Sequence, residues 1–163
     1  MSRLQFLNLV VAAALPVCTR AEFLSIDQKY SGIDCASCVK SIESGIKRIR
    51  GVEAVEVVAA EGVAKVKLAP GNTAGLDRVR DAIKATGYTP DTARVTVRGR
   101  VVEAAGVLKL ELSGSAAHLV LRANGASSTE LRPGADPVLV EGIVSVPPNP
   151  REPAILEVTA VRR

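Results

Sequence analysis

The hydrophobic pattern of the first hundred residues changes in an order that few folds accommodate. Six segments that alternate like strands or repeat like helices follow one another: 23–31 (strand), 39–50 (helix), 53–59 (strand), 63–68 (strand), 76–83 (helix) and 92–97 (strand). This order is the split βαβ, or ferredoxin-like, arrangement, a four-stranded antiparallel sheet with both helices on one face. The pattern therefore predicts that the first and third strands form the central pair.

Each helix carries a boundary signal. The first pattern ends with Lys47, Arg48 and Arg50, where cations suit the negative end of the helix dipole, and Gly51 then supplies a left-handed residue. We expect Asn72 or Thr73 to cap the second helix and Gly87 to end it. Residues expected on the inner faces are Val39, Ile42, Ile46 and Ile49 of the first helix, and Leu76, Val79, Ala82 and Ile83 of the second.

The expected strands of the first half have one apolar face. Residues expected to point inward are Leu24, Ile26, Gln28 and Tyr30 of the first strand, and Ala64, Val66 and Leu68 of the third. Lys65 and Lys67 should point outward. A core built from these residues is aliphatic, because aromatic residues make up only 2% of the chain.

The second half of the chain shows strand patterns and no helix. The five expected strands cover 95–102, 108–112, 119–121, 138–146 and 155–161. Glycine and proline turns separate them, which favours a small closed or partly closed barrel of the OB type, with a small sandwich as the alternative. Gly142 should mark a bulge or bend. The fold class predicted is thus α+β: a ferredoxin-like βαββαβ domain at 22–94 followed by an OB-like all-β domain at 95–163.

Residues 1–21 have the character of a secretory signal peptide. Arg3 precedes an apolar run from Leu4 to Leu15, and Thr19-Arg20-Ala21 offers small residues for cleavage after Ala21. The run is too short for a membrane span, which takes about 20 apolar residues. We therefore expect a periplasmic or secreted protein with no stable span after cleavage; lipidation at Cys18 is a minor alternative.

Composition argues against a nucleic-acid partner. The chain carries a net charge of +4, a mild excess that includes Arg3 and Arg20 of the expected signal peptide. Single-stranded nucleic acid also needs aromatic stacking faces, which are scarce here.

Two cysteines, Cys35 and Cys38, lie three positions apart directly before the first helical pattern. This spacing places them on a turn that leads into a helix N-terminus, where unpaired N–H groups stabilise a thiolate. Thiolates bind soft metals, and two of them favour a low-coordinate ion such as Cu(I). Zn(II), Cd(II) and Hg(II) are the alternative ions, and a carboxylate beside the two thiolates, as Asp34 offers, makes a harder site that favours a divalent ion. The lone His118 is expected to be an outward strand residue.

The segment Gly32-Ile33-Asp34-Cys35-Ala36-Ser37-Cys38-Val39 resembles the Gly-Met-x-Cys-x-x-Cys loop of heavy-metal-associated domains, which occur in copper chaperones, metal-pumping ATPases and the periplasmic mercury-binding protein. Gly51-Val52 and Gly87-Tyr88 also match, so the resemblance covers about residues 22–95. It implies a ferredoxin-like fold with Cys35 and Cys38 as the metal ligands.

This sequence departs from that family pattern at two positions. Ile33 replaces a methionine that packs beneath the loop, and Asp34 stands where copper proteins usually have threonine. Some zinc, cadmium and lead pumps of the family carry aspartate there as an extra ligand. Tyr88 occupies a position near the loop, where it either shields the site or packs as a half-exposed ring.

Three functions compete on this basis. The first is an exported, non-enzymatic module that carries one soft metal ion to or from a membrane metal transporter or another metal-handling protein. The second is a thiol–disulfide oxidoreductase that uses Cys35 and Cys38, since export implies an oxidising compartment. The third makes the metal module an adapter whose barrel binds protein or glycan. Residues 95–163 show no catalytic grouping of side chains.

The first helix also carries a basic surface, formed by Lys40, Lys47, Arg48 and Arg50. A solvated face is the simpler interpretation. The sharper hypothesis is docking to an acidic surface on a pump or receptor.

Overall fold

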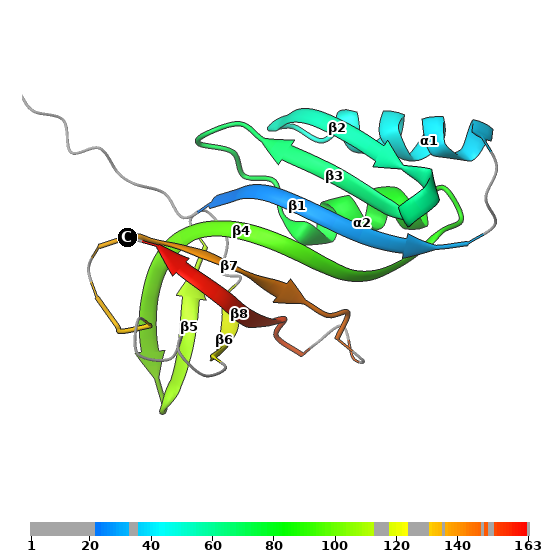
Figure 1. Ribbon diagram of the computed structural model, residues 1–163. Coiled ribbons are helices and arrows are strands. Elements are labelled where there is room, and N and C mark those ends of the chain that lie inside the picture. The colour runs from blue at the N-terminus through cyan, green and yellow to red at the C-terminus, as the bar shows by residue number, and fades with distance from the viewer. Residues whose placement is uncertain are drawn as a thin grey trace, which may run out of the picture.

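The structure, a computed structural model, describes residues 22–32, 36–112, 118–123, 131–134, 136–147, 149 and 152–162. Its elements in chain order are β1 (Glu22–Ser31), α1 (Ala36–Lys47), β2 (Val52–Val58), the 3-10 turn η1 (Ala59–Glu61), β3 (Val63–Leu68), α2 (Leu76–Lys84), β4 (Thr89–Ala104), β5 (Val107–Glu111), β6 (His118–Ala123), β7 (Val138–Val144) and β8 (Ile155–Arg162) (Figure 1). The expected signal peptide, residues 1–21, lies outside the described residues.

The first half has the expected ferredoxin-like arrangement. Strands β2, β3, β1 and β4 lie side by side in that order, and every neighbouring pair is antiparallel. Both helices lie behind this part of the sheet in Figure 1. The predicted central pair, β1 and β3, is confirmed.

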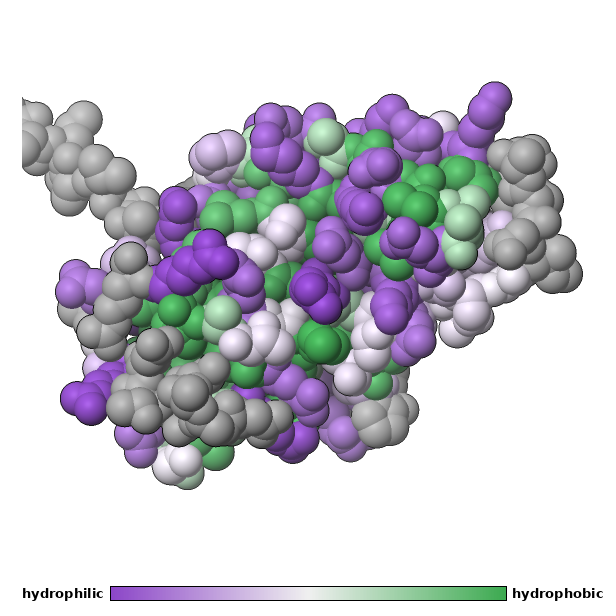
Figure 2. Space-filling model, in the orientation of Figure 1, coloured by the Kyte–Doolittle hydropathy of each residue, from purple (hydrophilic) through white to green (hydrophobic). Residues whose placement is uncertain are grey.

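The opposite face of this sheet is polar. Hydrophilic side chains predominate over β1, β3 and β4 in Figure 2. Lys65 of β3 and Arg94 of β4 are exposed there, and both lie opposite Asp27 of β1 in the strand registers. Neighbouring strands thus place opposite charges side by side, which stabilises a sheet face that water covers.

A bulge in β1 changes which residue enters the core. The register with β4 shifts between Phe23 and Ser25, so Leu24 has no partner residue. Phe23 is 4% exposed and joins Ile26 in the core, whereas Leu24 is only half-buried. The expectation that Leu24 lies on the inner face is therefore wrong, because simple alternation cannot include an extra residue.

Helix α1 buries its predicted face and ends earlier than expected. Ile42 and Ile46 are fully buried and Ile49 is partly buried, but the helix ends at Lys47 rather than at Arg50. The chain then turns through Gly51, which has a positive φ of 97°. Glycine adopts this left-handed conformation without steric cost.

The predicted cap of α2 is wrong. The helix begins at Leu76, and Gly75 is its N-cap residue, without a side-chain hydrogen bond. Asn72 instead connects the preceding loop to β1. Its Nδ2 donates to the carbonyl oxygens of Phe23 and Ala69, each at 2.8 Å, and its Oδ1 accepts from the N–H of Ala74 at 3.0 Å.

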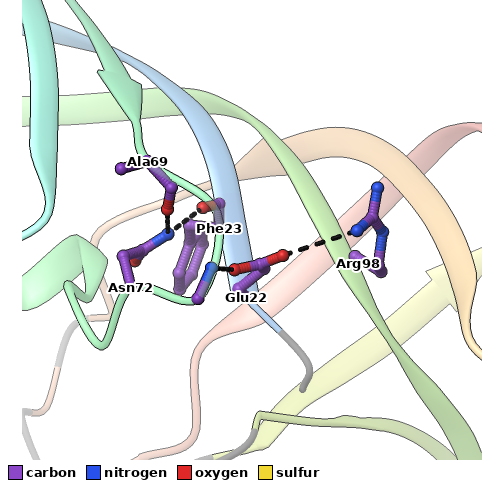
Figure 3. A network of polar contacts seen from close by, with 6 residues as sticks. Glu22, Phe23, Ala69, Asn72 and Arg98 are labelled. Carbon is purple, nitrogen blue, oxygen red and sulfur yellow. Dashed lines mark hydrogen bonds and ion pairs between the residues drawn. The ribbon is translucent and has the colours of Figure 1, made fainter. Parts of the chain in front are cut away.

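A buried carboxylate lies beside Asn72 in Figure 3. Glu22 is 6% exposed, accepts a hydrogen bond from the N–H of Gly71 and forms an ion pair with Arg98 of β4 at 3.5 Å. Together these contacts fasten the first residues of β1 to the loop before α2 and to β4.

Strand β4 belongs to both halves of the chain. It is one strand of 16 residues, where the sequence suggested two overlapping strands. Residues 89–98 pair with β1, residues 93–99 also pair with β7, and residues 100–104 pair with β5. The predicted domain boundary between residues 94 and 95 falls inside this strand.

The C-terminal strands, β5 to β8, form an all-β second half. Their pairings run from β4 through β5, β6, β8 and β7 and return to β4; β6 and β8 are parallel and the other pairs antiparallel. All eight strands belong to one sheet. The prediction of an all-β half is confirmed for the residues that the structure describes, and its classification as an OB-like barrel stays a prediction.

Gly142 of β7 lies at a register shift with β8, as its sequence context predicts. A Cβ atom at this position would lie 2.3 Å from the carbonyl oxygen of Glu157. Only glycine allows β8 to approach this closely.

One continuous core extends across both halves. Fully buried side chains come from every region of the fold: Ile42 in α1, Ile83 in α2, Val95 in β4, Leu110 in β5 and Leu156 in β8. The core is almost entirely aliphatic, as the composition predicts.

Candidate metal centre

The predicted ligands lie at the junction between β1 and α1. Asp34 and Cys35 are outside the described residues. Cys38 is the third residue of α1, and only its backbone is described. The assignment of these three residues as ligands therefore stays a prediction, and the structure establishes the frame around them.

Helix α1 begins directly after Cys35. The first N–H groups of a helix have no partner within the helix and give its start a positive potential. The first turn of α1 contains no acidic residue that would offset this potential. Such a terminus favours anionic groups, including thiolates.

Two tyrosines fix the chain where it enters this segment. Tyr88 lies against Gly32, where a Cβ atom would come within 2.6 Å of Tyr88 Cδ1. The rings of Tyr88 and Tyr30 pack edge to face, with centroids 5.2 Å apart. Tyr88 is only 5% exposed, so the expected half-exposed ring is wrong. Because the bare Gly32 backbone allows close approach, the Tyr88 ring packs inside, against the chain at the end of β1.

The basic residues of α1 face solvent. Lys40, Arg48 and Arg50 are exposed, and Lys47 forms an exposed ion pair with Glu43. His118 lies far from α1, at the start of β6, where it is paired with β5. Among the side chains that the structure describes, no three His, Cys, Asp or Glu residues lie close enough together to hold a metal ion.

Comparison with protein families matches residues 29–89 to the model of the heavy-metal-associated domain. This segment is a heavy-metal-associated domain. The match begins within β1 and ends at the start of β4, so the C-terminal strands lie outside it. No curated protein matches the chain.

The solved structures compared below each cover less than half of the chain. The N-terminal domain of PacS from Synechocystis PCC6803 is 31% identical, with 44% of this chain and 94% of that chain covered and a TM-score of 0.36. The N-terminal domain of a potential copper-translocating P-type ATPase from Bacillus subtilis, in its Cu(I)-loaded state, is 25% identical, with coverages of 42% and 85% and a TM-score of 0.38. The CopZ metallochaperone is 24% identical, with coverages of 43% and 97% and a TM-score of 0.36.

The heavy-metal-associated domain contains a buried polar pair, formed by Gln28, which was expected on the inner face of β1, and Arg80, which was not expected to be buried. Gln28 is completely buried, and its Nε2 donates to the carbonyl oxygens of Lys29 at 2.7 Å and Asp91 at 2.8 Å. Its Oε1 accepts from Nε of Arg80 at 3.1 Å. Arg80 Nη2 also donates to the carbonyl oxygen of Val144 in β7, at 3.1 Å.

Burial lowers the pKa of Arg80, although Asp77 and Asp91 oppose this shift. The signal for Arg80 was present in the sequence. It follows Leu76 by one helical turn and precedes Ile83 by three residues, which places it on the inner face of α2. An arginine on that face needs buried acceptors, and β1 and β7 supply them.

In the described part of the chain, no helix is both long and apolar enough to cross a bilayer.

Proposed function

We propose that the protein is an exported metal carrier that captures a soft metal ion, with Cu(I) preferred, and transfers it through Cys35 and Cys38. One observation carries the proposal: the Cys-x-x-Cys pair lies inside the heavy-metal-associated domain, next to the start of α1. Export to the periplasm or the cell exterior rests on the signal-peptide character of residues 1–21.

The chemistry follows from the donor set. Two thiolates satisfy a soft monovalent ion and leave room for a third ligand from another protein. A closed structural zinc site would need four protein ligands, and this segment offers only Cys35, Cys38 and Asp34. Such an open site suits transfer of the ion better than permanent storage.

The first test is native mass spectrometry of the reduced protein with Cu(I), Zn(II), Cd(II) or Hg(II). We expect one ion per monomer, lost in Cys35→Ser and in Cys38→Ser and retained in the control Ser44→Ala, which changes an exposed residue farther along α1. Asp34→Thr should leave Cu(I) bound and weaken the divalent ions, if the carboxylate is a ligand. Insulin reduction by a protein that binds no metal would instead support the thiol–disulfide oxidoreductase.

We propose a membrane metal transporter or another metal-handling protein as the exchange partner. Among the similar structures, one is a domain of a potential copper-translocating ATPase and another is a metallochaperone. If the basic face of α1 docks to an acidic partner surface, reversing Lys40 and Lys47 to glutamate should slow ion transfer by about tenfold or more, because charge complementarity governs encounter rates.

The matched control for this charge reversal replaces Arg78 and Lys84 on α2 with glutamate, because both are exposed residues of the same charge. The measurement is the rate of ion transfer from the donor to the acceptor protein, with the two proteins labelled with different isotopes so that a mass spectrum distinguishes them. Unchanged transfer in the variant of Lys40 and Lys47 would show that α1 is simply a solvated face.

We also propose that β4 and the C-terminal strands form an OB-like barrel. The supporting observations are the five strands, the return of their pairings to β4 and the apolar residues that β4, β7 and β8 bury. An experimental structure in which β4 and β7 are not hydrogen-bonded would contradict this classification.

A further inference from the structure

The C-terminal strands share a strand with the heavy-metal-associated domain. Ala93, Val95 and Val97 of β4 are fully buried, and the same stretch of β4 pairs with β1 on one side and β7 on the other. Loss of β7 would therefore uncover an edge of the domain's own sheet, where backbone groups would need new partners. This shared strand makes separate opening of the two halves costly.

A buried side chain also joins the halves. Arg80 belongs to α2, yet one of its hydrogen bonds goes to Val144 at the end of β7. Through Gln28 it is connected to β1, which leads two residues later to Tyr30. Because Arg80 is only 5% exposed, separating β7 from α2 would leave buried polar groups without these partners.

The same stretch of β1 supports the predicted metal loop. Tyr30 packs on Tyr88, which lies against Gly32, the last described residue before Cys35. These contacts, together with the backbone of β1 between Gln28 and Tyr30, connect the entrance of the loop to β7.

We propose that the two halves open as one cooperative unit, so that an ion bound at Cys35 and Cys38 stabilises β7 and β8 as strongly as β1 and β3. The inference rests on the proposed metal binding for its ligand. The C-terminal strands are then a structural part of the metal carrier, and their exposure depends on metal occupancy. A ligand that binds only the folded state lowers the population of every globally opened state by the same factor.

Native-state hydrogen exchange of the full chain, with and without Cu(I) under reducing conditions, tests this coupling. At free Cu(I) 100-fold above its dissociation constant, the slowest amides of β1, β3, β7 and β8 should all gain about 100-fold in protection. A gain restricted to β1 and β3 would overturn the proposal.

A failure of metal binding gives a different result. In that case the native mass spectrum shows no bound ion, and Cu(I) leaves the exchange rate of every amide unchanged. This result would overturn the proposed function. Cooperativity is then decided without metal, by exchange at increasing urea concentrations. If β1 and β7 share one opening free energy, the two halves form a single cooperative unit. If β1 and β7 have different opening free energies, the proposal is overturned.

The variant Arg80→Leu tests the joint itself, with Arg78→Leu as the control because Arg78 is exposed on the same helix. In Arg80→Leu the protection that Cu(I) gives to β7 should fall at least tenfold below that of β1. In Arg78→Leu, Cu(I) should give β7 and β1 equal protection. Equal protection in both variants would remove Arg80 from the proposal, and if Arg80→Leu does not fold, the wild-type exchange data still decide it.

Discussion

The turn between β4 and β5 places an alanine in an unfavourable conformation. Ala105 and Gly106 form a two-residue hairpin loop, and both have positive φ values, 54° and 75°. Such loops favour asparagine or aspartate followed by glycine, because alanine pays a steric penalty in the left-handed region. The side chain of Ala105 is exposed, so a larger residue meets no obstacle.

We predict that Ala105→Asn raises the free energy of unfolding by about 0.5–1 kcal/mol. The measurement is urea denaturation followed by circular dichroism. The neighbouring exposed Ala104 provides the control, since it lies in β4, where asparagine is disfavoured. Ala104→Asn should therefore give no gain, and a gain of equal size there would point to a cause other than the turn.

A second residue-scale prediction concerns Gly142. Adding a single methyl group by Gly142→Ala should destabilise the protein by about 2 kcal/mol or more, because the new Cβ would overlap the backbone of β8. Gly134→Ala is the matched control, since the corresponding Cβ would meet only the carbonyl oxygen of Arg132 at 3.9 Å, an ordinary contact distance. Thermal unfolding of the two variants makes the comparison, and similar melting temperatures would contradict the close approach of β7 and β8.

At the scale of elements, the start of β1 depends on the loop before α2. Asn72→Ala removes the contacts that join this loop to Phe23, and it leaves buried carbonyl groups without a donor. We expect a loss of about 2 kcal/mol in unfolding free energy. Thr73→Ala, an exposed neighbour, should change it by less than about 0.5 kcal/mol. Hydrogen exchange should show the largest increase in the first residues of β1.

The elements could be predicted from the sequence wherever burial follows a regular period. The inner faces of α1 and β3 satisfy that condition, and Ile42, Ile46, Val66 and Leu68 are buried as expected. The residues whose positions were predicted wrongly depart from the regular pattern for individual structural reasons. A bulge moves Phe23 into the core, and Asn72 bonds to a strand almost fifty residues away instead of capping a helix.

The candidate site was predictable to a different degree. Spacing and flanking glycines were enough to place Cys35 and Cys38 at the start of a helix, but α1 begins at Ala36, so Cys38 lies in its first turn and not on the turn before it. The burial of Tyr88 was not predictable, since it depends on contact with Gly32 across the fold. The spacing of Arg80 from Leu76 and Ile83 indicates the inner face of α2, but its acceptors were not predictable, because they come from β1 and β7, segments that only the folded chain brings together.

At the scale of the whole molecule, the two halves should not be separable at residue 94. A chain ending there would lack Val95 and Val97, which are completely buried. It would also lack β7, the strand that pairs with β4 on the flank opposite β1. We predict that residues 22–94 alone give no cooperative thermal transition, whereas residues 22–163 give a single one. Circular dichroism of the two chains provides the measurement, and a cooperatively folded 22–94 fragment would refute the prediction.

The cyclic pairing around β4 also decides where the protein is exposed to aggregation. Among the described strands, β2 alone has a single neighbour; every other strand is hydrogen-bonded on both flanks over at least part of its length. Growth of fibrils by strand addition would have to begin at β2, where Glu53 and Glu56 are exposed. Glu56 presents a negative charge to an incoming identical strand, and Glu53 shares its charge with Lys67 at 3.0 Å. Neutralising both glutamates, by acid or by substitution, should turn this one flank into a seed for self-assembly.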